Sequence, residues 1–160
     1  MSNINCFLKS TLVSTSKGDL SFKELYDLQE TGKSLPKVLT SFTHDNFELI
    51  EILEVLKLEA DPLIKITFEN NSFIKISNTN TIYTVDGLIK LDNIDLDVTL
   101  IGVPDNLKII GIDNIQSKES HLYSLKLNNH NYLIKTSTKT DNESYLLVNS
   151  QYEEVEILDE

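Results

Sequence analysis

The chain has 160 residues, a length typical of one domain with a substantial hydrophobic core. Its 40% hydrophobic and 24% charged residues describe an ordinary globular protein. The net charge of −11 and the absence of Arg argue against binding to nucleic acid or to an anionic membrane surface. No apolar run approaches the length of a transmembrane helix, and the first residues lack the pattern of a secretory signal. We therefore expect a cytoplasmic monomer. The composition, rich in Asn, Ile and Lys and without Arg, suggests a host with an AT-rich genome, such as a bacterium or phage.

The only cysteine, Cys6, excludes an internal disulfide and a zinc site built from several cysteines. A lone cysteine is usually a small buried hydrophobic residue. The alternative is a nucleophile, which needs an activating neighbour. We find no Gly-rich phosphate loop and no cluster of metal ligands, and so expect no cofactor and no metal.

The first third of the chain predicts short strands and one helix. Residues 6–18 alternate apolar and polar residues and end at a turn, Lys17–Asp19. Ser21 and Glu24 have the spacing of a capping box, and apolar residues follow at helical intervals, which predicts a short helix near 21–29. Gly32 and Pro36 end this segment.

The segment 48–58 is ambiguous, because its apolar residues could line one face of a helix. Its β-branched residues favour a long strand with a bend. A weakly alternating strand is also predicted just before it, over 38–42.

Hairpin patterns fill the rest of the chain. Asn70–Asn71, Asp86–Gly87 and Pro104–Asn106 are turn sequences between apolar segments. The predicted strands are 63–68, 73–76, 82–83, 88–89, 98–103, 107–112, 123–127, 132–134 and 145–148. Many short strands at close intervals predict an all-β sandwich or barrel-like fold, followed by a loose acidic tail.

Four segments, in chain order, resemble the conserved blocks of inteins and related Hint domains. They are Cys6 to Leu25, Ile76 to Gly87, Leu122 to Tyr132 and Tyr145 to Ser150. The resemblance implies an all-β, horseshoe-like Hint fold with pseudo-twofold symmetry and the short helix near 21–29. Only 34 residues separate Gly87 from Leu122, too few for a homing endonuclease, which implies a mini-intein. It also implies a domain over 6–149, flanked by extein-like segments 1–5 and 150–160.

The same resemblance implies a reaction on the chain's own backbone. Cys6 would attack the carbonyl of Asn5 and convert the amide between them into a thioester. Residues of the second block, Ser77, Thr79 and Asn80, would polarise that carbonyl and hold the oxyanion.

The later steps would use the C-terminal end of the domain. Ser150 would accept the acyl group, and Asn149 would cyclise and cut the bond between them. His130 would be the remaining acid–base residue. Such a domain would act in cis on its own flanks, once per molecule, without a cofactor.

Three positions depart from the family pattern. Asn80 and Val148 stand where histidines are usual, and Ser124 replaces a frequent Asp. Asn cannot supply a titratable proton near neutral pH, so splicing is expected to be atypical or weakened. Two alternatives remain: a degenerate Hint domain with a structural or interaction role, and a domain that cleaves only at Cys6. Splicing predicts that the Asn5 carbonyl, the Cys6 sulfur, His130 and Asn149 converge.

Overall fold

The computed structural model describes residues 5–43, 46–59, 62–77, 81–116, 118–128, 131–138 and 143–149. Strands dominate it, and the predicted all-β class is confirmed. The elements are β1 Leu12–Thr15, β2 Gly18–Ser21, α1 Phe22–Glu30, β3 Lys37–Thr43, β4 Asn46–Glu51, β5 Glu54–Glu59, β6 Leu63–Phe68, β7 Phe73–Ser77, β8 Thr81–Thr84, β9 Gly87–Lys90, the 3-10 turn η1 Leu91–Asn93, β10 Thr99–Leu100, β11 Gly102–Val103, β12 Leu107–Ile115, β13 His121–Lys126, β14 Asn131–Lys135 and β15 Tyr145–Asn149. Within the described residues, no helix has the length and apolar sequence needed to cross a bilayer.

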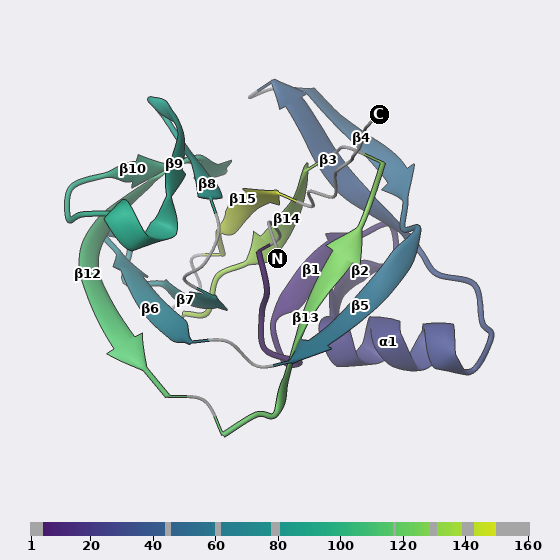
Figure 1. Cartoon of the computed structure of the whole chain (residues 1–160). Helices are drawn as coiled ribbons and strands as arrows, with labels where there is room; N and C mark the ends of the chain where they lie inside the picture. The colour runs from purple at the N-terminus through teal and green to yellow at the C-terminus, as the bar shows by residue number, and fades with distance from the viewer. Residues whose placement is uncertain are drawn as a thin grey trace, which may run out of the picture.

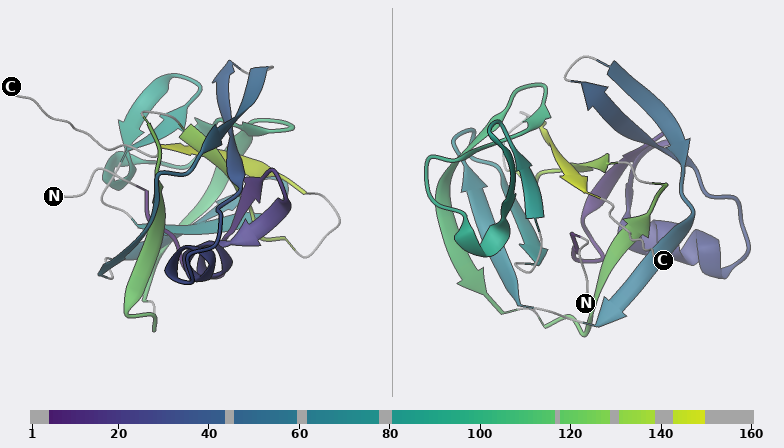
Figure 2. Two further views of the ribbon diagram at one scale, coloured as in Figure 1. Left: turned by 90° about the vertical axis from the view of Figure 1, so that its right-hand side faces the viewer. Right: turned by 45° about the horizontal axis from the view of Figure 1, so that its top comes forward.

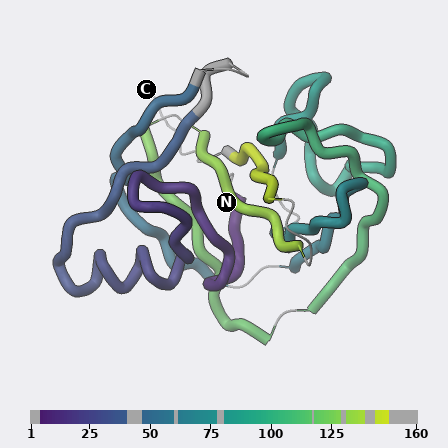
Figure 3. Tube along the Cα trace, turned by 180° about the vertical axis from the view of Figure 1, so that it is seen from behind, coloured from purple at the N-terminus to yellow at the C-terminus, as the bar shows by residue number. Residues whose placement is uncertain are grey.

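The strands form three sheets that curl into a horseshoe-like arrangement (Figures 1 and 2). One sheet has the order β11-β15-β14-β1-β3-β4, with β2 paired to β1. The second has the order β7-β6-β12-β10-β8-β9, and the third consists of β13 and β5. The molecule has two lobes, one that contains α1, β3 and β4 and one that contains β6 and β8–β10. Seen from behind, β14 and β15 lie between these two lobes (Figure 3). The N-terminal segment runs along β13 at the centre of the molecule (Figure 1).

The predicted helix and its cap are confirmed. The Ser21 hydroxyl accepts a hydrogen bond from the Glu24 N–H, and the Glu24 carboxylate accepts one from the Ser21 N–H, each at 3.0 Å. This reciprocal pair satisfies two donors that a helix start otherwise leaves unpaired. Phe22 and Leu25 point into the core and hold the helix against the sheets.

The ambiguous segment 48–58 is extended, so the helical alternative is wrong. It is also not one bent strand, because β4 pairs with β3 whereas β5 pairs with β13. The chain changes sheets at Ile52, which is buried, and Leu53, which is exposed. The predicted strand 98–103 likewise divides into β10 and β11, which belong to different sheets. Periodicity alone cannot reveal such a change of partner.

Two predicted hairpin turns are confirmed by their backbone. Asn71, between β6 and β7, has a φ of 69°, and Gly87, at the turn between β8 and β9, has a φ of 116°. Both lie in the left-handed region that Asn and Gly tolerate best. The predicted strand 107–112 extends to Ile115 and carries a bulge between Ile109 and Gly111.

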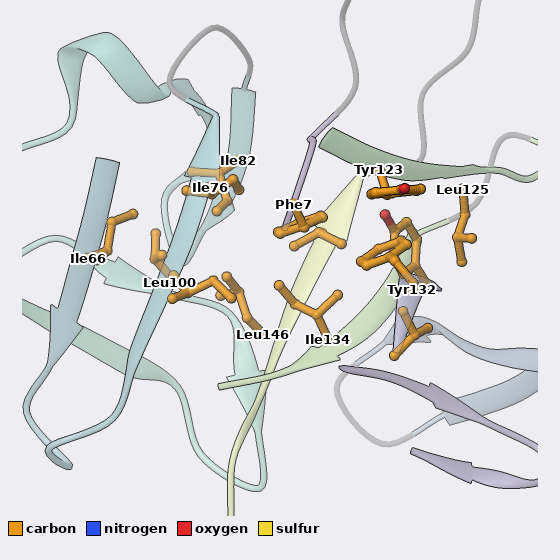
Figure 4. Close-up of a cluster of buried hydrophobic side chains, with 14 of the residues drawn as sticks. Phe7, Ile66, Ile76, Ile82, Leu100, Tyr123, Leu125, Tyr132, Ile134 and Leu146 are labelled. Carbon is orange, nitrogen blue, oxygen red and sulfur yellow. The ribbon is translucent and has the colours of Figure 1, made fainter. Parts of the chain in front are cut away.

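The core joins the N-terminal segment to the strands of both lobes. Phe7 stacks on Phe22 at a ring-centroid distance of 5.6 Å, and Phe22 meets the edge of Tyr132 at 6.5 Å. Figure 4 shows Phe7 in this cluster, between the lobe of Ile76 and Ile82 and the side chain of Tyr132. Both Phe7 and Tyr132 are fully buried. This packing fixes the position of the residues immediately before Phe7.

Candidate functional site

The segment Asn5–Phe7 is held between β13 and the end of β7. Phe7 and Tyr123 exchange two backbone hydrogen bonds of 2.8 Å each. On the other side, the Ser77 N–H donates to the Cys6 carbonyl at 3.0 Å. The chain therefore enters the fold as an extra strand-like segment with little freedom to move.

The peptide bond between Asn5 and Cys6 is bound at both of its polar ends by side-chain hydroxyls. The Ser124 hydroxyl donates to the Asn5 carbonyl oxygen at 2.7 Å. The Cys6 N–H donates to the Ser77 hydroxyl oxygen at 3.1 Å. Both serines are completely buried. These partners come from β13 and β7, and Phe7 forms a β-bridge to each of these two strands.

The site is closed to solvent. Asn5 is 1% exposed and Cys6 is 2% exposed. The Asn5 side-chain amide donates to the Thr81 carbonyl at 2.9 Å, while Cys6 packs in a small cluster with Leu63 and Leu122. Exclusion of water strengthens the hydrogen bonds on the peptide and would protect a thioester from hydrolysis.

Tyr132 lies directly behind Ser124, with the two hydroxyl oxygens 3.4 Å apart. Burial raises the pKa of the Tyr132 phenol well above its usual range, although hydrogen bonding with Ser124 and with the Leu125 backbone acts in the opposite direction. A negative charge on the nearby Cys6 would raise that pKa further. Tyr132 therefore stays protonated and is a hydrogen-bond donor at neutral pH.

The structure brings together two of the predicted site residues, Cys6 and Ser77, which are 71 positions apart in the chain. Asn149 is the last residue of β15, and its backbone pairs with Asn131. The next pair along the ladder joins Val148 to Tyr132, so the end of β15 lies beside the strand that carries Tyr132. Five further predictions fall outside what the structure describes: the positions of Thr79, Asn80, His130 and Ser150, and the side chain of Asn149.

A second polar group lies beside the backbone of Asn149. The Thr40 hydroxyl donates to the Asn131 side-chain carbonyl at 2.8 Å. Burial raises the pKa of Tyr83, and a hydrogen bond with the Asn131 side chain opposes that shift. Asn131 therefore joins β3 and β8 at the ladder position that faces Asn149.

Sequence reasoning missed the contacts of Ser124 and Tyr132 beside the Asn5 carbonyl. It treated Ser124 only as the loss of a frequent Asp, whereas the structure places this hydroxyl on the Asn5 carbonyl. The signal was present, because Ser124 occupies the Asp position of the third block and keeps a hydrogen-bonding side chain there.

Among the described residues, no group of three His, Cys, Asp or Glu side chains could hold a metal ion.

No family model and no curated protein sequence matches the chain. Solved structures do match it closely in shape. The Ssp DnaB mini-intein variant M86 is 14% identical, with a TM-score of 0.73, and the match covers 98% of this chain and 99% of that one. The DnaB intein from Synechocystis is 16% identical, with a TM-score of 0.70 and coverage of 92% and 99%. The bacterial intein-like domain from Clostridium thermocellum is 18% identical, with a TM-score of 0.70 and coverage of 90% and 97%. The chain thus has the Hint fold in the form found in mini-inteins, which lack an endonuclease domain.

Proposed function

We propose that this chain is a self-processing Hint domain that shifts the acyl group of Asn5 from nitrogen to the sulfur of Cys6 and then splices its flanks. The observation that carries the proposal is the binding of one peptide bond by two buried hydroxyls, Ser124 on the carbonyl and Ser77 on the N–H. A peptide with a purely structural role in a β fold normally pairs with backbone groups.

Hydroxyl partners suit a peptide that must change its hydrogen-bonding character. A hydroxyl both donates and accepts, whereas a backbone carbonyl only accepts. As the amide nitrogen of Cys6 becomes an amine with a lone pair, Ser77 can rotate from accepting to donating. Ser124 already donates to the oxygen on which negative charge develops, and one such donor typically contributes ~100- to 1,000-fold in rate.

The first step balances without an added reactant. The Cys6 sulfur bonds to the Asn5 carbonyl carbon, and the carbon–nitrogen bond then breaks. The thiol proton ends on the released amine of Cys6, so the mass of the chain does not change. The product is a thioester, whose acyl group is more easily transferred than that of an amide.

We propose that the remaining steps follow the mini-intein pattern. The Ser150 hydroxyl would attack the thioester, form an ester and return the thiol to Cys6. The side-chain amide of Asn149 would attack its own backbone carbonyl, form a succinimide and release the amine of Ser150. That amine would then take the acyl group from the Ser150 oxygen, which joins Asn5 to Ser150 by an ordinary amide. Residues 1–5 and 150–160 are the flanks in this scheme, and the reaction occurs within one chain.

The test is the intact mass of the purified chain over time, with and without dithiothreitol or hydroxylamine. Hydroxylamine should release residues 1–5 as a hydroxamate and leave residues 6–160. Full splicing should give free 6–149 and a joined peptide of 1–5 with 150–160. Cys6→Ala should abolish both outcomes, and Cys6→Ser should slow them because a hydroxyl is a weaker nucleophile.

Different patterns of products separate the alternatives. Release of residues 1–5 in the absence of hydroxylamine, without any joined peptide, would mean that the domain cleaves only at Cys6. An unchanged mass in every condition, with the fold intact by circular dichroism, would refute self-processing. That result would leave a Hint domain with a structural or interaction role.

A further inference from the structure

Three buried residues form a chain of hydrogen bonds that ends on the Asn5 carbonyl. Tyr132 and Ser124 are each 0% exposed, and Asn5 is 1% exposed. The Tyr132 and Ser124 oxygens are 3.4 Å apart, and the Ser124 oxygen is 2.7 Å from the Asn5 oxygen. Figure 4 shows Tyr132 extending from its strand toward the strand that carries Tyr123 and Leu125.

The number of available protons fixes the direction of these hydrogen bonds. A serine hydroxyl has one proton, and that of Ser124 is used on the Asn5 carbonyl. The bond between Ser124 and Tyr132 must then use the phenol proton, with the Ser124 oxygen as acceptor. Because Tyr132 stays neutral at ordinary pH, this proton is always available.

The backbone of β13 adds a further donor to this chain of hydrogen bonds. The Tyr123 N–H points toward the N-terminal segment, where it donates to the Phe7 carbonyl. N–H groups alternate between the two edges of a strand, so the Leu125 N–H lies on the same edge. It bonds to the Tyr132 oxygen. All donors therefore point the same way, from Leu125 through Tyr132 and Ser124 to Asn5.

We propose that Tyr132 is a positioning residue for the acyl shift, one that keeps the Ser124 hydroxyl aimed at the Asn5 carbonyl and polarises it. This inference rests on the self-processing function proposed above. Without the phenol, the small Ser124 hydroxyl can rotate away from the carbonyl. With it, each bond strengthens the next, by ~10–30% per bond in a chain of this kind. The 3.4 Å bond shortens as charge builds on the Asn5 oxygen.

The kinetic test is a double-mutant cycle on the release of residues 1–5 by hydroxylamine. Tyr132→Phe should slow release ~3- to 10-fold, as expected for one lost hydrogen bond. Ser124→Ala should slow it ~100-fold, and adding Tyr132→Phe to Ser124→Ala should change nothing further. Tyr26→Phe, which removes a tyrosine hydroxyl from α1, is the matched control and should leave the rate unchanged.

Two kinetic results would overturn the proposal. One is an equal slowing by Tyr132→Phe with and without Ser124, because the phenol would then act through packing alone. The other is an unchanged rate in Tyr132→Phe.

A second measurement decides the question even if the chain never cleaves. Ala60 is the only alanine and follows Glu59, so Cys6→Ala creates the only Asn–Ala pair in the chain. Labelling asparagine with carbonyl ¹³C and alanine with ¹⁵N then gives one carbonyl signal, that of Asn5. This signal should move upfield in Tyr132→Phe and further upfield in Ser124→Ala, and the double variant should match Ser124→Ala. A signal that does not respond to Tyr132→Phe would refute the positioning role of Tyr132, whether or not the chain cleaves itself.

Discussion

Ser77 and Cys6 exchange two hydrogen bonds: the Cys6 N–H donates to the Ser77 hydroxyl at 3.1 Å, and the Ser77 N–H donates to the Cys6 carbonyl at 3.0 Å. The backbone bond anchors the segment, while the side-chain bond acts on the peptide that the proposed reaction breaks. The two contributions can therefore be separated by changing the side chain alone.

We expect Ser77→Ala to slow the release of residues 1–5 by hydroxylamine about 5- to 30-fold, because the departing Cys6 nitrogen loses the hydroxyl that can donate to its lone pair, a contribution of ~1–2 kcal/mol. Ser77→Thr should retain most of the rate. Ser72→Ala is a matched control, since Ser72 is equally buried but bonds to Asn70, away from Cys6. Equal rates for Ser77→Ala and the unchanged chain would contradict a role for this hydroxyl in the reaction.

The group around Asn131 should affect the other end of the domain. Thr40→Val removes the hydroxyl that bonds to the Asn131 side chain, opposite the backbone of Asn149. We expect cleavage after Asn149 to slow about 3- to 10-fold, with release of residues 1–5 unchanged. The measurement is the mass of each product over time. Thr136→Val, which removes a buried hydroxyl bonded to Ser144, is the control, and slowing at both junctions would count against the assignment.

Stability should fall at alkaline pH because of Tyr145. Burial, followed by the hydrogen bonds that its hydroxyl donates to Asp19 at 2.9 and 3.1 Å, raises the pKa of Tyr145 from 10.0 to about 12. Between these values the folded chain keeps a proton that the unfolded chain has lost, so the free energy of unfolding decreases as pH rises. Urea unfolding from pH 9 to 12 should show a shallower decrease for Tyr145→Phe. Identical slopes would mean that this phenol does not hold its proton in the folded state.

Two glycines provide a matched pair for packing. A Cβ atom on Gly102 would lie 2.8 Å from the Tyr145 carbonyl oxygen and 2.9 Å from that of Asp105, whereas on Gly111 its nearest neighbour would be Thr67 at 3.5 Å. We expect Gly102→Ala to lower the free energy of unfolding by ~1–3 kcal/mol, because the backbone at Tyr145 and Asp105 must move to make room for the added methyl group. Gly111→Ala should be neutral or slightly stabilising. Urea titrations in a Cys6→Ala background measure both, and equal effects would contradict the close approach at Gly102.

The sequence by itself determined the local elements. The capping box at Ser21 and Glu24 marked the start of α1, and Asn71 and Gly87 marked turns, because each depends on contacts within a few residues. The resemblance of four segments to intein blocks indicated the Hint fold and singled out Cys6. The first signals are short-range and the last depends on the order of segments along the chain. Both kinds can be recognised in a single sequence.

Only the tertiary structure decided which strands pair and what surrounds the first peptide of the domain. Alternation looks the same whichever sheet a strand joins, so the division of 48–58 between two sheets could not be predicted. The hydroxyl of Ser124 lies 119 positions from Asn5 in the chain, and no local pattern links them. Their contact exists because β13 pairs with the N-terminal segment, which Phe7 anchors in the core. A position that looked like a lost carboxylate is thereby a buried donor on the Asn5 carbonyl.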